Sequence, residues 1–489
     1  MNYFAVLRHI GLLVSIQGLL MLTSVYWALY YRDGCAGSIL AAAALTLAGG
    51  GAMFAVGRLR RQEVYRREAL AIVGVSWLLA AAFGALPFML TGSVSGFVDG
   101  FFEAMSGFTT TGSTILTDIE AVPKSVLWWR SFTHWLGGMG IVVLFLAILP
   151  ILGAGGKHLY KNEVPGLIED ALTPKIRETA VILWKIYLVF TVAETLLLMS
   201  ASSRMTLFEA LCHTFGTLAT GGFSTKNASV GYFNSLAVEL IIILFMFLAG
   251  VNFTLHFRVW RERGKLSSYW SDPEWRTYTG LIAAATMLVA LQLRLAPQMQ
   301  DSYGGWGRAL RDAAFQVVSI ITTTGYGTAD FNQWPPGSKA LLVALMFVGG
   351  CGGSTGGGLK VIRWLTLVKI ARNQIERVYQ PHRVRPLRIG AAIIDQDLQM
   401  NTMIYFFIAI FIFVAATIAV SFSGTDVVTS ATAVAATMNN IGPGLERVGA
   451  IENYAFFHPW VKVLLSILMV IGRLELFSIL VLFIPRFWK

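Results

Sequence analysis

Short runs of threonine and glycine, recurring four times, are the residues in this sequence best suited to chemistry. The runs are Thr110-Thr111-Gly112, Ala219-Thr220-Gly221, Thr323-Thr324-Gly325 and Asn440-Ile441-Gly442. Their glycines lie 109, 104 and 117 residues apart. Glycine lets successive backbone carbonyls point the same way because it adopts positive φ, and threonine adds a hydroxyl oxygen. A ring of such oxygens can replace the water around a partly dehydrated cation.

The composition of the runs favours a monovalent cation. A filter for divalent cations would more often use rings of carboxylates, and none of the four runs contains Asp or Glu. The alternative is that each run is an ordinary turn between helices, which is the better interpretation of any one run alone. Four runs at matched positions favour a ring.

The overall composition indicates a membrane protein. Hydrophobic residues make up 55% of the chain and charged residues 13%, with a mean hydropathy of +0.64, whereas soluble domains carry about 25% charged residues. The first apolar segment, 10–31, is long enough to span a bilayer. We expect it to be a helix because no small-residue cleavage site of a signal peptide follows it. The net charge of +11 lies mostly in short loops, which indicates topology and not a nucleic-acid partner.

Basic loops predict which end of each span is cytoplasmic. Outer segments such as 91–123 are poor in Lys and Arg, whereas four loops are rich in them: 58–67, 153–178, 258–276 and 372–399. The positive-inside rule places these loops in the cytoplasm, and alternation then places both termini there. Four apolar segments that precede the Thr-Gly runs are too short to cross and are predicted to be re-entrant.

The predicted fold is therefore an all-α polytopic membrane protein with ten transmembrane helices. Two N-terminal helices precede four parallel repeats, each of which reads span, short helix, Thr-Gly loop and span, in a pseudo-four-fold arrangement. The predicted units are an N-terminal segment, 1–68, and pore repeats at 69–153, 154–258, 259–371 and 372–489.

A glycine-rich stretch interrupts the last span of the third repeat. Seven of the ten residues 349–358 are glycine, and each costs about 1 kcal/mol in a helix relative to alanine. The spacing fits neither common phosphate-binding glycine motif, and close helix packing is the other alternative. We expect a gate beneath the ring, formed by Gly349, Gly350, Gly352, Gly353, Ser354, Thr355, Gly356, Gly357, Gly358 and Lys360. Lys360 either contacts this gate or extends to the cytoplasmic surface.

Arg473 is a charged residue within the last apolar span. A charge at this depth is costly and usually faces the interior of the bundle. A structural ion pair is the alternative, although Glu475 is two residues away and so not on the same helix face. We assign Arg473 to the gate.

Other kinds of chemistry find little support. The three cysteines and seven histidines form no metal-binding pattern, and no paired acids or activated nucleophile indicate an enzyme. No nucleotide motif and no cofactor site are apparent. Glu194 and Glu239 lie within apolar spans and could carry protons, so a proton- or sodium-coupled secondary transporter remains the alternative to a channel.

Thr324-Gly325-Tyr326-Gly327 resembles the potassium-channel filter, and the four-unit plan resembles the TrkH/TrkG/KtrB superfamily of potassium transporters. The two extra N-terminal spans are similar to the TrkH/TrkG branch. The resemblance implies that K⁺ is the substrate and that Gly112, Gly221, Gly325 and Gly442 are the filter glycines. It also implies an intramembrane gating loop and a pore role for Arg473 as a barrier to cations. The fourth run departs most, because it lacks the paired threonines.

The resemblance further implies a setting for the chain. The family functions in the bacterial cytoplasmic (inner) membrane, surrounded by lipid, as a homodimer. It pairs with a cytosolic, nucleotide-binding TrkA-type regulatory ring. We expect that ring to dock on the basic loops 153–178, 258–276 and 372–398.

Overall fold

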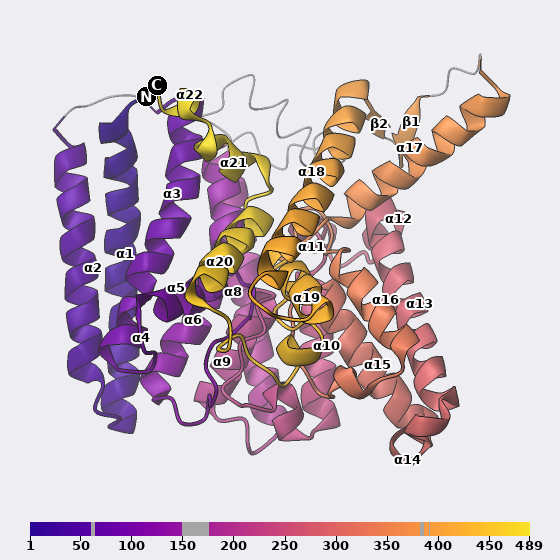
Figure 1. Ribbon diagram of the computed structural model, residues 1–489, viewed down its shortest axis with the longest axis horizontal. Helices are drawn as coiled ribbons and strands as arrows, with labels where there is room; N and C mark the ends of the chain where they lie inside the picture. The colour runs from indigo at the N-terminus through magenta and orange to yellow at the C-terminus, as the bar shows by residue number, and fades with distance from the viewer. Residues whose placement is uncertain (60–63, 149–175, 382–385, 391) are drawn as a thin grey trace.

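The computed structural model describes residues 1–59, 64–148, 176–381, 386–390 and 392–489 of the chain. Long helices run between two opposite faces, and the two termini lie side by side at one of them (Figure 1). Most of the basic loop 153–178 and the predicted boundary at 153/154 lie outside the described residues. The predicted boundaries at 258/259 and 371/372 fall inside the helices α11 (Phe253–Arg261) and α17 (Val361–Tyr379).

An antiparallel helix pair begins the chain, formed by α1 (Tyr3–Tyr31) and α2 (Ala36–Gly57). The Asn2 side chain caps α1, and Arg32 ends it with a left-handed conformation. The two helices approach closely at Gly11 and Gly50, where a side chain would lie within 3 Å of the facing backbone. Small residues allow such close packing between membrane helices.

The rest of the chain repeats one order of elements four times: a long helix, a short helix, a non-helical turn and a return segment. The first set is α3 (Arg66–Gly84), α4 (Leu86–Leu90), α5 (Phe97–Phe108) and α6 (Lys124–Ile148). The second is α8 (Ile176–Ala201), α9 (Leu207–Leu218), η1 (Ser229–Phe233), α10 (Leu236–Ala249) and α11. The third is α12 (Ser267–Ser271), α13 (Pro273–Leu295), η2 (Pro297–Met299), α14 (Gln300–Tyr303), α15 (Trp306–Ile321), η3 (Phe331–Gln333), α16 (Pro336–Met346) and α17. The fourth is α18 (Gln396–Ser421), α19 (Val427–Met438), η4 (Glu446–Val448), α20 (Pro459–Arg473), α21 (Phe477–Leu480), η5 (Val481–Phe483) and α22 (Pro485–Trp488).

The short helices α5, α9, α15 and α19 form the centre of the molecule. Each is buried along almost its whole C-terminal half, because it is apolar on most of its surface and is surrounded by longer helices. The turns that carry the Thr-Gly runs follow directly from these buried helix ends.

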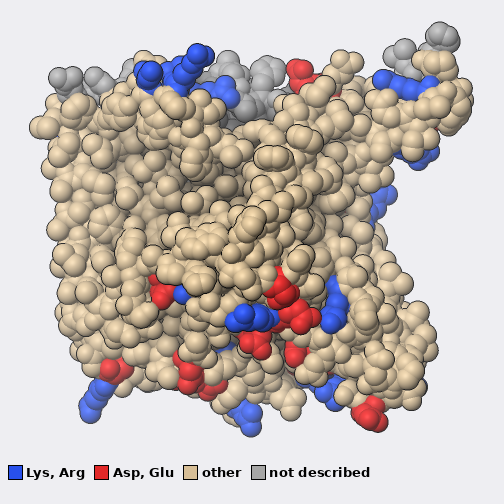
Figure 2. Space-filling view, in the orientation of Figure 1, with Lys and Arg blue, Asp and Glu red and all other residues tan. Residues whose placement is uncertain are grey.

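Several apolar helices fit a membrane. In the described part of the chain, six are long and apolar enough to cross one, and a seventh span results if α10 and α11 count as one bent helix. The ten predicted spans are not all recovered by this criterion because two return segments are broken into shorter helices. The visible charged side chains lie along the upper edge, on the arm formed by α17 and in the lower third of the view (Figure 2).

A small β-hairpin is a departure from the predicted all-α fold. Strands β1 (Leu387–Ile389) and β2 (Ala392–Ile394) pair antiparallel, with Leu387 opposite Ile394. Leu387, Ile389 and Ile394 pack in one buried cluster with Ile370 of α17. Three-residue strands alternating in burial are too short to be distinguished from a loop by sequence periodicity.

Candidate ion pathway

The four turns share one backbone conformation. The short helices end at the caps Thr109, Ala219, Thr322 and Asn439. The next residue has positive φ in every turn: 53° at Thr110, 55° at Thr220, 59° at Thr323 and 54° at Asn440. Two residues later a glycine has positive φ in every turn: 83° at Gly112, 77° at Gly222, 80° at Gly325 and 101° at Gly442.

This conformation corrects the predicted register of the second run. Gly222, and not Gly221, is the equivalent of Gly112, Gly325 and Gly442, and Ala219 is the helix cap that precedes the turn. Two adjacent glycines fit the sequence pattern in either frame, and the wrong one was chosen. The aromatic residue after the glycine was the available signal, because Phe223 follows Gly222 as Tyr326 follows Gly325.

The four turns close into a ring through backbone contacts at their glycines. A methyl group added at Gly112 would lie 2.1 Å from the carbonyl oxygen of Gly221, and one at Gly222 would lie 1.9 Å from that of Thr324. The series continues from Gly325 to Ile441 at 1.9 Å and from Gly442 back to Thr111 at 2.9 Å. No side chain fits these positions, and the order runs once around the four turns.

The fourth turn differs from the others in its hydrogen bonds. Asn440 Nδ2 donates to Thr111 Oγ1 and to the carbonyl of Met469, each at 2.9 Å. The carbonyl of Gly442 accepts from the Tyr454 hydroxyl at 2.8 Å and from the Ser113 hydroxyl at 3.1 Å. This carbonyl is therefore already engaged by protein donors.

The glycine-rich segment lies against the ring as a non-helical loop, residues 347–360, between α16 and α17. The backbone N–H of Gly357 donates to Thr323 Oγ1 at 2.7 Å. A methyl group at Gly357 would also lie 2.7 Å from the carbonyl oxygen of Asn439. The loop thus contacts the third and fourth turns at the ends of their short helices.

A break in the second return segment holds the same loop from the side. Helices α10 and α11 meet at an angle of 95° around residues 250–252. Cys351 N donates to the carbonyl of Gly250 at 2.8 Å, and Phe253 N donates to that of Gly353 at 3.1 Å. Two interruptions in neighbouring return segments therefore satisfy each other's backbone groups, as irregular backbone within a membrane requires.

Arg473 joins the loop to the first return helix. Its Nη1 donates to the carbonyl of Thr355 at 2.7 Å, and its Nη2 donates to that of Gly137 at 3.1 Å. The side chain is buried. Glu475 pairs with Arg363 at 2.6 Å, so the positive charge of Arg473 lies next to the loop and is hydrogen-bonded to carbonyls there.

Comparison with known proteins identifies the family. The family model TrkH, described as a cation transport protein, matches residues 38–489. The chain belongs to the TrkH family. It is 40% identical over 491 residues to the Trk system potassium uptake protein TrkH of Halomonas elongata, covering 100% of both chains. It is 31% identical over 491 residues to the Trk system potassium uptake protein TrkG of Escherichia coli, covering 100% of this chain and 99% of the other.

The fold matches a solved member of the family. The crystal structure of the potassium transporter TrkH from Vibrio parahaemolyticus superposes with a TM-score of 0.90 at 35% identity, covering 100% of both chains. The chain is thus a membrane transport protein, not an enzyme, and the TrkH/TrkG branch is the correct one.

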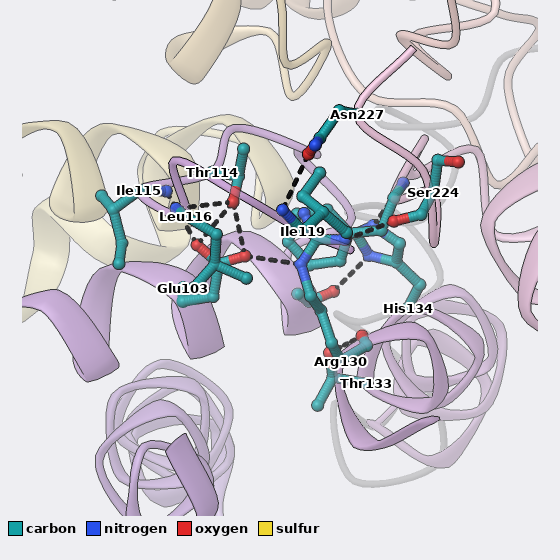
Figure 3. Close-up of polar contacts among 12 residues, drawn as sticks. Glu103, Thr114, Ile115, Leu116, Ile119, Arg130, Thr133, His134, Ser224 and Asn227 are labelled. Carbon is teal, nitrogen blue, oxygen red and sulfur yellow. Dashed lines mark hydrogen bonds and ion pairs between the residues drawn. The ribbon is translucent and has the colours of Figure 1, made fainter. Parts of the chain in front are cut away.

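A buried ion pair behind the ring is a feature of this TrkH-family chain that sequence reasoning missed. Arg130 of α6 is 1% exposed and donates from Nε to Glu103 of α5 at 2.6 Å and from Nη1 to the carbonyl of Ser224 at 2.9 Å (Figure 3). Glu103 also accepts from Thr114 Oγ1 and from Ile115 N. The pair therefore ties the first turn to the second. Charges inside apolar segments were the signal available for it.

His134 makes a second connection between these turns. Its Nδ1 lies 2.8 Å from the carbonyl of Gly107, and its Nε2 lies 3.2 Å from the N–H of Phe223. These partners assign the proton to Nδ1, because a carbonyl accepts and an N–H donates. The neutral ring thus fixes the end of α5 relative to the turn after α9 (Figure 3).

The outer connections of the same two turns include an exposed contact. Asn227 Oδ1 accepts from Ile119 N at 2.7 Å, and its Nδ2 donates to Asp118 Oδ1 at 2.9 Å. The hydrogen bond from Asn227 lowers the pKa of the Asp118 carboxyl. This contact joins the chain segments that leave the ring.

Lys360 lies at the end of the glycine-rich loop. Its Nζ donates to the carbonyl of Gly356, so of the two predicted placements the structure has the contact with the loop. The predicted loop residues thus form one body that touches the ring, the α10–α11 break and Arg473.

Proposed function

We propose that this chain takes up K⁺ through the ring formed by the four turns. The observation that carries the proposal is the shared backbone conformation of four turns that meet in cyclic order. Relatives of the full chain length are Trk system potassium uptake proteins by name, which supports K⁺ as the ion. The proposed K⁺ ligands are oxygens of residues 110–112, 220–222, 323–325 and 440–442.

The chemistry of the ring suits a monovalent cation. Backbone carbonyls replace the hydration shell, and the short helices end at the ring, so the negative ends of their dipoles point toward the ion. The Gly442 carbonyl is engaged by Tyr454 and Ser113, so it is a weaker ligand than its equivalents. We therefore infer that discrimination against Na⁺ is softer than in a four-fold symmetric filter.

The loop 347–360 and Arg473 form the proposed gate. A closed loop beneath the ring obstructs the path of the ion, and the charge of Arg473 repels it. Conduction requires the bonds of Arg473 to Thr355 and of Gly357 to Thr323 to be released or rearranged.

The wider assembly belongs to the same proposal. It consists of ten spans with four parallel repeats, placed in a bacterial inner membrane with both termini cytoplasmic. Two copies pair, and a TrkA-type nucleotide-binding ring docks on the basic loops. The arm of α17 carries Lys369, Arg372 and Arg377, which suits docking at this end of the molecule.

Ion uptake by the purified protein in liposomes tests the proposal. We expect wild type to take up K⁺ faster than Na⁺, and Gly325→Ser to lose this preference because a side chain there overlaps the Ile441 carbonyl. Gly327→Ser is the matched control, since the nearest atom to a side chain at Gly327 is 3.6 Å away. Equal uptake of the two ions by wild type would contradict a selective ring.

A coupled transporter is the second candidate, favoured by Glu194. This residue of α8 is fully buried, and neither carboxylate oxygen has a hydrogen-bond partner in the described structure. Glu239, in contrast, pairs with Arg311 at 2.5 Å. K⁺ uptake at fixed K⁺ gradient, with and without an imposed pH gradient, separates the two. Uptake driven by the proton gradient and lost in Glu194→Gln supports coupling.

A further inference from the structure

Glu274 is a buried carboxylate that contacts the glycine-rich loop from outside it. It lies in the first turn of α13 and is 7% exposed. One of its oxygens, Oε1, accepts from Gly352 N at 2.8 Å and from Ile362 N at 2.9 Å. A single atom therefore binds the chain where it enters the loop and where it leaves.

The two ends of the loop also pair with each other at this place. Gly349 N donates to the carbonyl of Leu359 at 2.8 Å, and Val361 N donates to that of Gly350 at 3.2 Å. The loop is thus closed at its base by two backbone hydrogen bonds. Glu274 accepts from the residues next to these bonds and extends the closure.

Glu274 also completes the start of α17. The N-cap residue of this helix is Lys360, whose side chain makes no capping hydrogen bond. The first N–H groups of a helix need acceptors from outside the helix, and an anion is favoured there by the helix dipole. Glu274 supplies both to Ile362, so it is a cap provided by another helix.

We propose that Glu274 is a positioning residue that keeps the glycine-rich loop shut by clamping its two ends together. The inference rests on the proposed gating role of the loop. The tip of the loop is held by Gly250, Thr323 and Arg473, whereas Glu274 holds the base where α17 begins. Displacement of α17 relative to α13 breaks both bonds of Glu274 at once and frees the loop.

Losing the clamp leaves unpaired groups. Glu274→Ala removes the acceptor of two backbone N–H groups, and buried donors without a partner are costly. Glu274→Gln keeps a carbonyl oxygen that can accept the same two bonds. The pair of variants therefore separates the hydrogen bonds from the charge.

Labelling of Cys351 measures the state of the loop without reference to transport. Cys351 lies in the loop and is fully buried, and Cys35 and Cys212 are also unpaired. In a Cys35→Ala, Cys212→Ala background, reconstituted protein is treated with a small thiol reagent and the rate at Cys351 is followed. We expect Glu274→Ala to raise this rate about tenfold, the effect of one lost hydrogen bond to a charged group, and Glu274→Gln to leave it close to that of wild type.

Two labelling results would overturn the proposal. One is a rate in Glu274→Ala equal to that of wild type, and the other is an equal rise in Glu274→Ala and Glu274→Gln, which would assign the effect to charge. Thermal unfolding of each variant in detergent checks that the fold is retained, and Glu274→Gln provides the comparison if Glu274→Ala is unstable.

Potassium flux then separates this proposal from the gate itself. We expect both Glu274→Ala and deletion of residues 352–357 to raise K⁺ flux into liposomes. A rise in the deletion variant alone overturns the clamp and leaves the gate. No rise in either overturns the gating role of the loop and, with it, any control of transport by Glu274.

Discussion

The ring and the layer beside it are built on opposite principles. In the ring, four turns of different sequence adopt one conformation, with positive φ at matched residues. In the adjoining layer the four return segments differ: α6 is one helix of 25 residues, α10 and α11 are bent by 95°, the loop 347–360 replaces helix, and α20 ends at Arg473.

This difference assigns separate tasks to the two regions. Coordinating one ion from four sides requires equivalent oxygens, so the backbone is repeated even where the side chains are not. Blocking a single path requires only one loop and one charge, so the other return segments are free to support them. The α10–α11 break does so by supplying the Gly250 carbonyl to Cys351.

The strongest test of the repeated ring is Gly222→Ala. Gly222 has φ of 77°, and an added methyl group would lie 1.9 Å from the Thr324 carbonyl. The left-handed conformation alone costs an L-residue about 1–2 kcal/mol, and steric overlap adds to it. We expect K⁺ uptake in liposomes to fall by more than about tenfold, since about 1.4 kcal/mol corresponds to that factor. Gly327→Ala, where the space is open, is the control, and equal uptake in both variants would remove Gly222 from the ring.

The asymmetric layer is tested by Arg473→Ala. A unit charge at about 10 Å in a medium of effective dielectric about 20 raises the barrier for a cation by about 1.7 kcal/mol. We therefore expect K⁺ flux in liposomes to rise by roughly tenfold when the charge is removed. Arg473→Lys keeps the charge but loses the two-pronged contact with Thr355 and Gly137, and a smaller rise is expected. Unchanged flux in Arg473→Ala and in the 352–357 deletion would contradict the gate.

Sequence patterns predicted what is local and missed what is assembled. The Thr-Thr-Gly runs at Gly112 and Gly325 were placed correctly because the turn follows directly from a short apolar helix. The frame at Gly222 was wrong because two adjacent glycines leave it open until the helix end is known. The glycine-rich loop was predicted from its density of glycine, which excludes a stable helix. Its partner Glu274 was not, because 78 residues separate it from Gly352 and only the fold brings them together.

The smallest effect is expected where the ring departs from its own symmetry. Tyr454→Phe removes the hydroxyl that donates to the Gly442 carbonyl at 2.8 Å, and Ser113→Ala removes the second donor at 3.1 Å. Each frees part of an oxygen that its equivalents offer to the ion, and a hydrogen bond of this kind is worth about 0.5–1.5 kcal/mol. We expect the ratio of K⁺ to Na⁺ uptake to rise by about threefold or less in Tyr454→Phe, by less in Ser113→Ala, and most in the double variant. A fall in the ratio would mean that these hydroxyls hold the fourth carbonyl in place for the ion and do not compete with it, so that the ring would depend on its irregular quarter as much as on the three regular ones.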